Sequence, residues 1–419
     1  MNFIRAILFF VLCSCSVSKI ERSIIAMEDE FHDHTGFLIV DPSSNKTFID
    51  YKSDKYFTPA SNTKILTFYA SLKFLGDSIP ALYYKEIGDS LIFWGTGDPS
   101  FLYQESPSLE AYEFLTQSKK QLYFSSTNFM DDKYGPGWAW EDLEFSWSAE
   151  KSSLPMYGNT FKIKKTSQLE VIPRFFEGFI IQGDSLVKTK CKRLLGSNNF
   201  NYNPGLDDYE EDFAFGTSGV LTADLLYDTL KRKVTSIEVN IPDDVNTLYH
   251  SNTDQLLKTM MQESNNMIAE QLLLVIAGIK TDTLKSSIAI EKIKSELLEG
   301  IPDEPKWIDG SGLSRYNAIT PRSLVWLLTN MYQKYGESIV EYFPAGGESG
   351  TLENYYLAES PYVFAKTGTM TKHHNLSGYL LTKKGKVFIF SFMNNNYTTN
   401  SLPVKRKMEG LLYDIYLNN

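Results

Sequence analysis

The chain has 419 residues, of which 42% are hydrophobic and 14% aromatic, and its formal net charge is -10. This length is more than one hydrophobic core usually supports, so we expect two or three domains. Lys and Arg do not outnumber Asp and Glu, and no basic block is interleaved with aromatic residues, so we expect no nucleic-acid partner.

Residues 1–18 have the pattern of an export signal. Arg5 is followed by the apolar run 6–12, which is too short to cross a bilayer and fits the core of a signal peptide. Residues 12–16 read Leu-Cys-Ser-Cys-Ser and resemble the bacterial lipobox. The pattern predicts a lipoprotein-type signal peptide over 1–15 and a lipid on Cys15, which would hold an exported, periplasmic protein on a membrane. Ordinary cleavage that releases a soluble protein is the alternative.

After the signal, the chain begins with a helix and a hairpin. Apolar residues at helical spacing predict a helix over 20–31, and two apolar runs separated by turn residues predict strands over 36–40 and 46–50. A second amphipathic helix starts at Ser61, directly after a Thr-Pro-Ala sequence, and its apolar residues continue to Leu75.

The middle of the chain, residues 81–246, reads as a β-rich insert. Short apolar runs such as 90–94 and 161–164 alternate with Gly, Pro and Asn clusters, which is typical of strands and turns. An aromatic cluster in this region includes Trp140 and Trp147. We interpret it as part of the core of the insert rather than as a surface that stacks on sugar rings.

Helical periodicity returns after the insert, and strand-like runs follow it. The predicted helices cover 253–263, 265–277, 283–299, 321–335 and 404–416, and the predicted strands cover 363–366, 376–381 and 387–392. This order indicates an α+β fold with an antiparallel sheet flanked by helices. We expect one discontinuous domain over 20–82 and 248–419, interrupted by an inserted β-rich domain over 83–247.

Ser61-Asn62-Thr63-Lys64 is the first pattern with chemical meaning. Positions i and i+3 share a helix face, so a neutral Lys64 amine can accept the proton of the Ser61 hydroxyl. Only Ser61 opens a strong amphipathic helix, whose N-terminal dipole and free N–H groups favour a developing oxyanion. The same S-x-x-K pattern also starts at Ser16, Ser43, Ser148 and Ser185.

Two further patterns follow in the sequence. Lys366-Thr367-Gly368 ends a predicted strand, where the Lys can offer positive charge to a substrate carboxylate and the Gly lets backbone approach a ligand. The alternative is an ordinary strand that ends in a turn. An S-x-N pattern occurs at 264–266 between two predicted helices and again at 197–199 in a predicted surface loop. We choose Ser264, because the loop lacks a framework that would hold a hydroxyl in place.

In this order, S-x-x-K, S-x-N and K-T-G are the signature of penicillin-binding proteins and class A β-lactamases. The chain resembles the D-alanyl-D-alanine carboxypeptidase/endopeptidase family, the class C low-molecular-mass penicillin-binding proteins. A long insert separates Lys64 from Ser264, which favours the peptidase over a β-lactamase. The stretches that carry the resemblance are 59–64, 309–315, 350–352, 365–369 and 376–379.

The resemblance implies a transpeptidase/β-lactamase-like catalytic domain whose β-rich insert holds a smaller nested domain near 160–215. It also implies that Ser61 is the nucleophile and Lys64 its general base. Ser264 and Asn266 would then form the relay near the leaving amine. The middle residue of that motif, Asn265, departs from the Asp of the family pattern.

The resemblance further implies a substrate-binding strand over 366–369. Lys366 and Thr367 would hold the terminal carboxylate of the substrate, next to Gly368. The backbone N–H groups of Ser61 and Thr369 would form the oxyanion hole. The glycine-rich segment 309–315 is expected to hold a loop against the catalytic domain and is not counted as catalytic.

The implied activity is that of a serine D-Ala-D-Ala carboxypeptidase or endopeptidase that acts on peptidoglycan stem peptides through an acyl-enzyme on Ser61, with β-lactam antibiotics as inhibitors. No cofactor is expected. We expect no metal either, because His32 and His34 have no further His or Cys cluster near them in sequence. The alternatives are a serine β-lactamase and a non-catalytic wall-binding or β-lactam-sensing lipoprotein.

Overall fold

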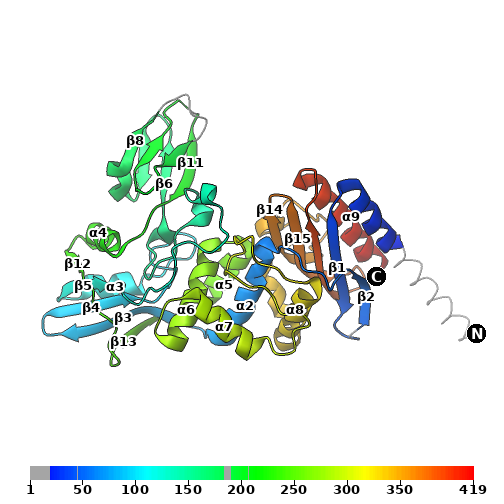
Figure 1. Cartoon of the computed structure of the whole chain (residues 1–419), viewed down its shortest axis with the longest axis horizontal. Coiled ribbons are helices and arrows are strands. Elements are labelled where there is room, and N and C mark those ends of the chain that lie inside the picture. Colours follow the sequence, from blue (N-terminus) through cyan, green and yellow to red (C-terminus); the bar gives the residue numbers. More distant parts are fainter. Residues whose placement is uncertain (1–18, 45, 184–189, 206) are drawn as a thin grey trace, which may run out of the picture. The chain divides into compact units, whose positions relative to one another are not determined.

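The computed structural model describes residues 19–44, 46–183, 190–205 and 207–419, and these form two compact units (Figure 1). The first unit comprises Met1–Ala70, Leu257–Ser264 and Ile293–Asn419, and the second comprises Ser71–Leu256 and Asn265–Lys292. The predicted signal peptide and Cys15 lie outside the described residues. Within the described ranges, no helix is long and apolar enough to cross a membrane.

The first unit is built on a five-stranded antiparallel sheet. Its strand order is β14-β15-β16-β1-β2, so strands from the two ends of the chain lie side by side. The register pairs Phe37 with Phe392 at the centre of the β1–β16 ladder. The strands are β1 (His34–Asp41), β2 (Lys46–Tyr51), β14 (Val363–Met370), β15 (His373–Leu381) and β16 (Val387–Asn395). The predicted α+β class with an antiparallel sheet is confirmed.

Helices cover both faces of this sheet (Figure 1). Residues 19–31 are helical, and they share one buried apolar cluster with α9 (Ser401–Asn418) and with Phe37 and Ile39 of β1. Alternate residues of a strand point to opposite faces, and a Cβ at Gly36 would meet Pro321 at the start of α8 (Pro321–Tyr335). The sheet is therefore enclosed between two helical layers. The region also contains η6 (Gly336–Tyr342) and η7 (Gly350–Leu352).

The second unit contains a mixed five-stranded sheet with the order β12-β5-β4-β3-β13. β5 runs parallel to both of its neighbours, whereas β3 is antiparallel to β4 and to β13. The strands are β3 (Ile79–Ile87), β4 (Ser90–Gly95), β5 (Gln121–Ser125), β12 (Val234–Ser236) and β13 (Asn246–His250). The helices that belong wholly to this unit are α3 (Glu110–Gln117), α4 (Gly219–Leu230) and α6 (Asn266–Thr281), whereas the residues of α5 (Thr253–Gln262) and α7 (Ser286–Leu297) are divided between the two units.

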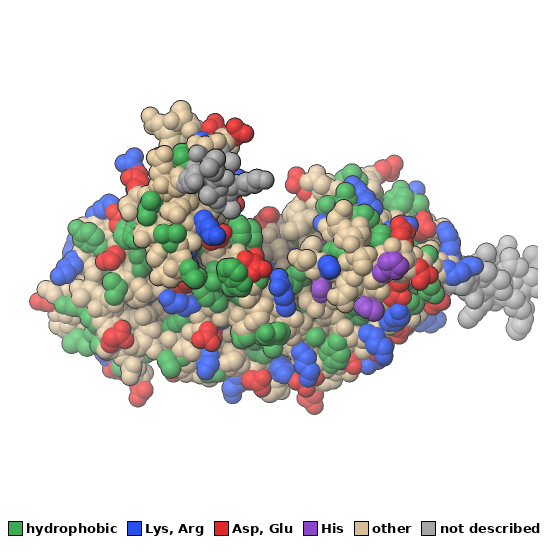
Figure 2. Space-filling model, turned by 45° about the horizontal axis from the view of Figure 1, so that its top comes forward, with side chains coloured by type: hydrophobic (Ala, Val, Ile, Leu, Met, Phe, Trp, Pro, Cys, Tyr) green, Lys and Arg blue, Asp and Glu red, His purple; other side chains and the backbone are tan. Residues whose placement is uncertain are grey.

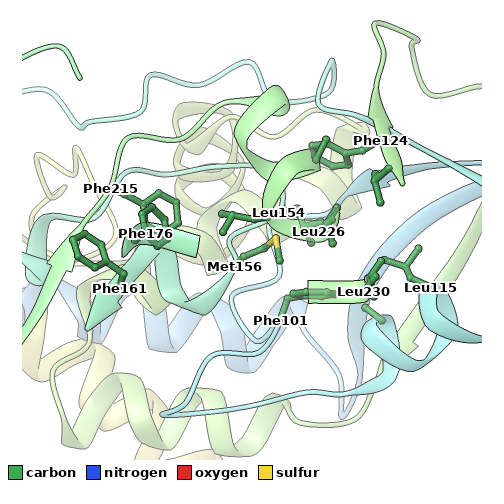
Figure 3. Packing of buried hydrophobic residues seen from close by; sticks show 14 of the residues in the cluster. Phe101, Leu115, Phe124, Leu154, Met156, Phe161, Phe176, Phe215, Leu226 and Leu230 are labelled. Carbon is green, nitrogen blue, oxygen red and sulfur yellow. The ribbon is translucent and has the colours of Figure 1, made fainter. Parts of the chain in front are cut away.

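Two small three-stranded sheets lie between β5 and α4 in the sequence. One has the order β11-β6-β7 and is antiparallel, and the other has the order β8-β10-β9. Figure 3 shows Phe161, Phe176 and Phe215 packed together in this part of the unit. The strands are β6 (Thr160–Lys165), β7 (Leu169–Ile172), β8 (Ile180–Gln182), β9 (Cys191–Arg193), β10 (Phe200–Tyr202) and β11 (Tyr209–Ala214).

Two features of the second unit differ from the sequence-based expectation. The helices α3 and α4 interrupt a region that was read as strands and turns, although the Ser218 side chain accepts a hydrogen bond from Leu221 N and marks the start of α4 as an N-cap. The interpretation of the aromatic cluster as core is wrong for Trp140 and Trp147, which are 75% and 46% exposed. Both lie in short 3-10 turns, which offer no continuous apolar face for packing.

Truncation of Phe161 tests the small apolar core between the two three-stranded sheets. Its ring stacks on Phe176 at 4.8 Å between centroids and meets Phe200 edge-on at 4.6 Å. Phe161→Ala should lower the free energy of unfolding of this region by about 3–5 kcal/mol because of the lost contacts and the cavity. Amide hydrogen exchange over residues 160–183 measures the loss. Leu195→Ala, at a side chain that is 89% exposed, is the control, and equal exchange in both variants would contradict the packing described.

Candidate active site

Ser61 and Lys64 are brought into contact by a tight turn. Ser61 lies in the 3-10 turn η1 (Ala60–Thr63), and α2 (Lys64–Phe74) begins at Lys64, so Ser61 precedes the α-helix rather than opening it. In a 3-10 turn the side chains at i and i+3 lie directly above one another. Lys64 Nζ accordingly lies 3.0 Å from Ser61 Oγ and donates a hydrogen bond to it. Lys64 is fully buried, whereas Ser61 is partly exposed.

A glycine-rich loop fixes the other side of the Lys64 amine. Lys64 Nζ donates to the backbone oxygen of Ser311 at 2.7 Å. The buried Asp309 holds this loop, because its carboxylate accepts from Gly312 N at 2.9 Å and from Ser314 N at 2.6 Å. The glycine-rich sequence of residues 309–315 predicts a loop contact here. The direct contact between the Ser311 carbonyl and Lys64 was missed, because a backbone carbonyl carries no signal in a sequence pattern.

Gly312 allows the same loop to reach the turn that carries Ser61. Its φ is +89°, and a Cβ on Gly312 would lie 1.9 Å from the backbone oxygen of Ala60. A side chain at this position would therefore force the loop and the turn apart. The glycine is required by close approach as well as by backbone conformation.

The strand β14 packs against the turn through Asn62, the second residue of the S-x-x-K motif. Asn62 Nδ2 donates to the backbone oxygen of Lys366 at 2.8 Å, and Asn62 Oδ1 accepts from Ser377 Oγ of β15 at 2.6 Å. A Cβ on Gly368 would lie 2.3 Å from the backbone oxygen of Pro59, which again explains a glycine. These contacts bring the first and third motifs together within the first unit.

The amine of Lys366 is fully buried close to the charge of Lys64. Its Nζ donates to the backbone oxygen of Thr367 at 3.2 Å. Burial, and secondly the positive charge of Lys64, hold the pKa of Lys366 well below its usual range, while the Glu263 carboxylate acts in the opposite direction. Protonation of either of these two amines therefore disfavours protonation of the other.

The two threonines of β14 have hydroxyl partners on neighbouring segments. Thr367 Oγ1 donates to Thr351 Oγ1 at 2.8 Å. Thr369 is exposed, and its Oγ1 lies 2.8 Å from Nδ1 of His374, which is almost fully buried. Burial, together with the charge of Lys405, lowers the pKa of His374 to about 3. The imidazole of His374 that contacts the Thr369 hydroxyl is accordingly neutral at neutral pH.

The S-x-N motif lies at the junction of α5 and α6. Ser264 belongs to the first unit, is partly exposed and has a left-handed backbone with φ of 58°. Asn266 is the first residue of α6 and belongs to the second unit, where its Nδ2 donates to the backbone oxygen of Trp147 at 2.8 Å.

Asn265, the middle residue of this motif, caps a helix and binds two neighbouring side chains. Its Oδ1 caps α6 by accepting from Ile268 N at 2.9 Å. Its Nδ2 donates to Tyr103 at 2.5 Å and to the Glu105 carboxylate at 2.6 Å. An ionised Asp could cap the helix but could not donate these bonds, so the departure from the family pattern fits the neighbouring acidic group.

Two glycine variants test the contact between the loop and the turn. Gly312→Ala should slow acylation of Ser61 by a penicillin by about 100-fold, since a displacement of roughly 1 Å misplaces the Lys64 amine. Gly300→Ala is the matched control, because Gly300 has a φ of +83° but nothing within 4 Å of its Cβ position. Similar acylation rates in the two variants would contradict the role of the close approach at Gly312.

The buried His374 predicts a loss of stability in acid. The folded protein keeps His374 neutral down to a pH of about 3, whereas the unfolded chain takes up the proton near the ordinary pKa of 6.5. Folding is therefore opposed increasingly as the pH falls below 6.5. Between pH 7 and pH 5 the wild type should lose about 2 kcal/mol more of its unfolding free energy than His374→Gln. Urea titrations at both values measure this, and equal losses would contradict the buried neutral histidine.

The sequence of this chain is similar to those of known enzymes. The profile of the D-Ala-D-Ala carboxypeptidase 3 (S13) family matches residues 19–173 and 218–413. D-alanyl-D-alanine carboxypeptidase DacB of Haemophilus influenzae is 22% identical over 435 residues, which cover 90% of this chain and 89% of the relative. Penicillin-sensitive carboxypeptidase A of Dictyostelium discoideum is 24% identical over 82% of this chain and 79% of its own length.

Solved structures share the fold. Penicillin binding protein 4 from Haemophilus influenzae superposes with a TM-score of 0.75 at 22% identity, over 92% of this chain and 96% of that chain. A predatory peptidoglycan endopeptidase from Bdellovibrio bacteriovorus has a TM-score of 0.52 at 14% identity, over 92% of both chains. The family profile covers most of the chain and includes the S-x-x-K, S-x-N and K-T-G motifs, so the protein belongs to the D-Ala-D-Ala carboxypeptidase 3 (S13) family.

Proposed function

We propose that this protein hydrolyses D-Ala-D-Ala-terminated stem peptides of peptidoglycan, as a serine carboxypeptidase or endopeptidase that forms an acyl-enzyme on Ser61. The observation that carries the proposal is the 3.0 Å hydrogen bond between Lys64 Nζ and Ser61 Oγ, in a turn tied to the strand of Lys366. A partly exposed hydroxyl held against a buried amine is the arrangement that nucleophilic catalysis requires.

In the acylation step, Ser61 Oγ attacks the carbonyl carbon of the penultimate D-Ala while Lys64 takes its proton. The bond between this carbon and the nitrogen of the terminal D-Ala then breaks, and the leaving amine receives a proton. We assign Ser264 and Asn266 to the relay that delivers it. In the second step water attacks the ester, releases the shortened peptide and restores the Ser61 hydroxyl.

The strand β14 would bind the substrate during both steps. We assign Thr367 and Lys366 to binding of the terminal carboxylate. The carboxylate would accept the hydrogen bond that Thr367 Oγ1 gives to Thr351 Oγ1, 2.8 Å away, in the structure without substrate, and a second hydrogen bond from the Lys366 amine. The N–H groups of Ser61 and Thr369 would stabilise the tetrahedral oxyanion. Gly368 keeps this strand close to the turn that carries the nucleophile.

We further propose that the protein is exported to the periplasm and anchored to a membrane by a lipid on Cys15. The support is the signal-like sequence of residues 1–18 and its similarity to the lipobox. The division into a catalytic domain over 20–82 and 248–419 and an inserted domain over 83–247, with a nested part near 160–215, stays a prediction.

Replacement of the nucleophile tests the proposed activity. Ser61→Ala should reduce D-Ala release from a pentapeptide by about 10⁴-fold or more and should abolish covalent labelling by penicillin. Ser43→Ala is the matched control, because Ser43 starts another S-x-x-K pattern but lies in the turn between β1 and β2. Release of D-Ala is measured by chromatography, and labelling by mass spectrometry.

The same experiment separates the alternatives. Undiminished D-Ala release by Ser61→Ala would remove the proposed nucleophile. Rapid hydrolysis of penicillin by the wild type, in place of a long-lived adduct on Ser61, would indicate a β-lactamase. A wild type that is labelled by penicillin but releases no D-Ala would indicate a β-lactam sensor.

A further inference from the structure

Three segments that are distant in the sequence converge at one end of the first unit. Lys19, where the described chain begins, forms an ion pair with Asp414 in the last turns of α9, with 3.2 Å between Nζ and Oδ2. In the turn between β15 and β16, Lys383 N donates to the backbone oxygen of Tyr416 at 3.0 Å, and Lys384 Nζ donates to that of Asn418 at 3.0 Å. Figure 1 shows the start of the first helix and the end of α9 at this same edge.

The exposed side chains at this end combine basic and apolar groups. Leu381, Tyr413 and Leu417 are 38%, 39% and 39% exposed. The basic side chains, all exposed, are Lys19, Lys383, Lys384 and Lys386. Figure 2 shows Lys and Arg side chains at the end of the unit where the described chain begins.

Acidic groups offset part of this charge. Asp414 is paired with Lys19, Glu21 lies on the first turn of the helix, and Asp41 and Glu337 line one pocket together with Lys386. Lys383 and Lys384 form no ion pair with the described residues, so these two lysines carry the positive charge of this end, in a chain whose formal charge is -10. This end is therefore suited to an anionic partner, although the protein as a whole is acidic.

The position of Cys15 in the sequence determines which anionic partner this end would meet. Lys19 follows Cys15 by four residues, a segment that can span at most about 14 Å when fully extended. A lipid on Cys15 would thus hold this end close to the headgroups, at a distance comparable with the screening length of about 8 Å in physiological salt.

We propose that this end of the first unit is a membrane-docking face that rests on an anionic phospholipid surface. The face is defined by Lys19, Leu381, Lys383, Lys384, Lys386, Tyr413 and Leu417. The inference rests on the proposed lipid on Cys15. Lysines next to an anchor are attracted to anionic headgroups, and tyrosine is favoured at the boundary between headgroups and acyl chains.

The docking face and the catalytic strand motif lie at opposite ends of the same sheet. Leu381 ends β15 at the docking face, whereas His374, near its other end, pairs with Thr369 of β14. Leu381 follows His374 by seven positions along the antiparallel strand, which corresponds to roughly 24 Å. Docking would therefore hold the end of β14 that carries Thr369 away from the bilayer and toward the cell wall.

The test uses the mature chain, residues 15–419, coupled through Cys15 to a maleimide lipid in vesicles. The other thiol, Cys191, is buried, and burial raises its pKa to about 12, so Cys15 reacts selectively. Amide hydrogen exchange in residues 381–386 and 413–418 is compared on vesicles of equal parts phosphatidylglycerol and phosphatidylcholine and on vesicles of phosphatidylcholine alone. Exchange should be about fivefold or more slower on the anionic vesicles.

Charge reversal identifies the groups responsible. Lys383→Glu with Lys384→Glu should remove the difference between the two kinds of vesicle. Lys233→Glu with Lys285→Glu makes the same change of charge at exposed lysines of the second unit and should leave the difference in place. Labelling of Ser61 by penicillin checks that each variant is folded. Equal exchange on both kinds of vesicle in the wild type, or an equal effect of both double variants, would overturn the docking face.

Failure of the anchor and failure of the docking face give different results. The chemical tether is made whether or not the cell attaches a lipid, so the vesicle experiment tests the face by itself. Mass spectrometry of the mature protein from cells reports the modification of Cys15. An unmodified Cys15 would contradict the lipid anchor on which the inference rests. Equal amide exchange on the anionic and the neutral vesicles would contradict the docking face.

Discussion

The structure of the candidate active site depends on keeping one buried amine hydrogen-bonded. Lys64 is fully removed from solvent, and a buried polar group without partners is costly. Its partners include the Ser61 hydroxyl and the Ser311 carbonyl. The second partner requires the loop that Asp309 organises and the close approach that Gly312 permits. The Ser61 hydroxyl, the Lys64 amine and the loop thus pack together as one cluster.

The sheet places this cluster next to β14, the strand to which substrate binding is assigned in the proposed function. β1 pairs with β16, so a segment before Ser61 and a segment near the C-terminus share one ladder. Asn62 then joins the turn of Ser61 to the backbone of Lys366, across 304 positions of sequence. Because these contacts lie within the first unit, the long segment Ser71–Leu256 can form its own sheets and core without altering them.

Local patterns predicted most elements of the first unit, because its helices and strands bury apolar residues in a shared core. Strand-like apolar runs predicted β15 and β16, which are buried along almost their whole length, and 3.6-residue periodicity predicted α8 and α9. The same reasoning failed for α3, which has eight residues and no side-chain cap. It also failed for Trp140, whose aromatic character suggested burial while its 3-10 turn left it exposed.

The sequence by itself determined the family, the α+β class and the motif residues, since S-x-x-K and K-T-G are short patterns in which spacing carries the chemistry. Only the tertiary structure decided how these motifs are held. Asn62 and the Ser311 carbonyl act through partners that fold next to them from remote parts of the chain. Such contacts depend on sheet register and loop closure, which no local pattern encodes. The burial of Lys366, and hence its lowered pKa, was likewise decided by packing.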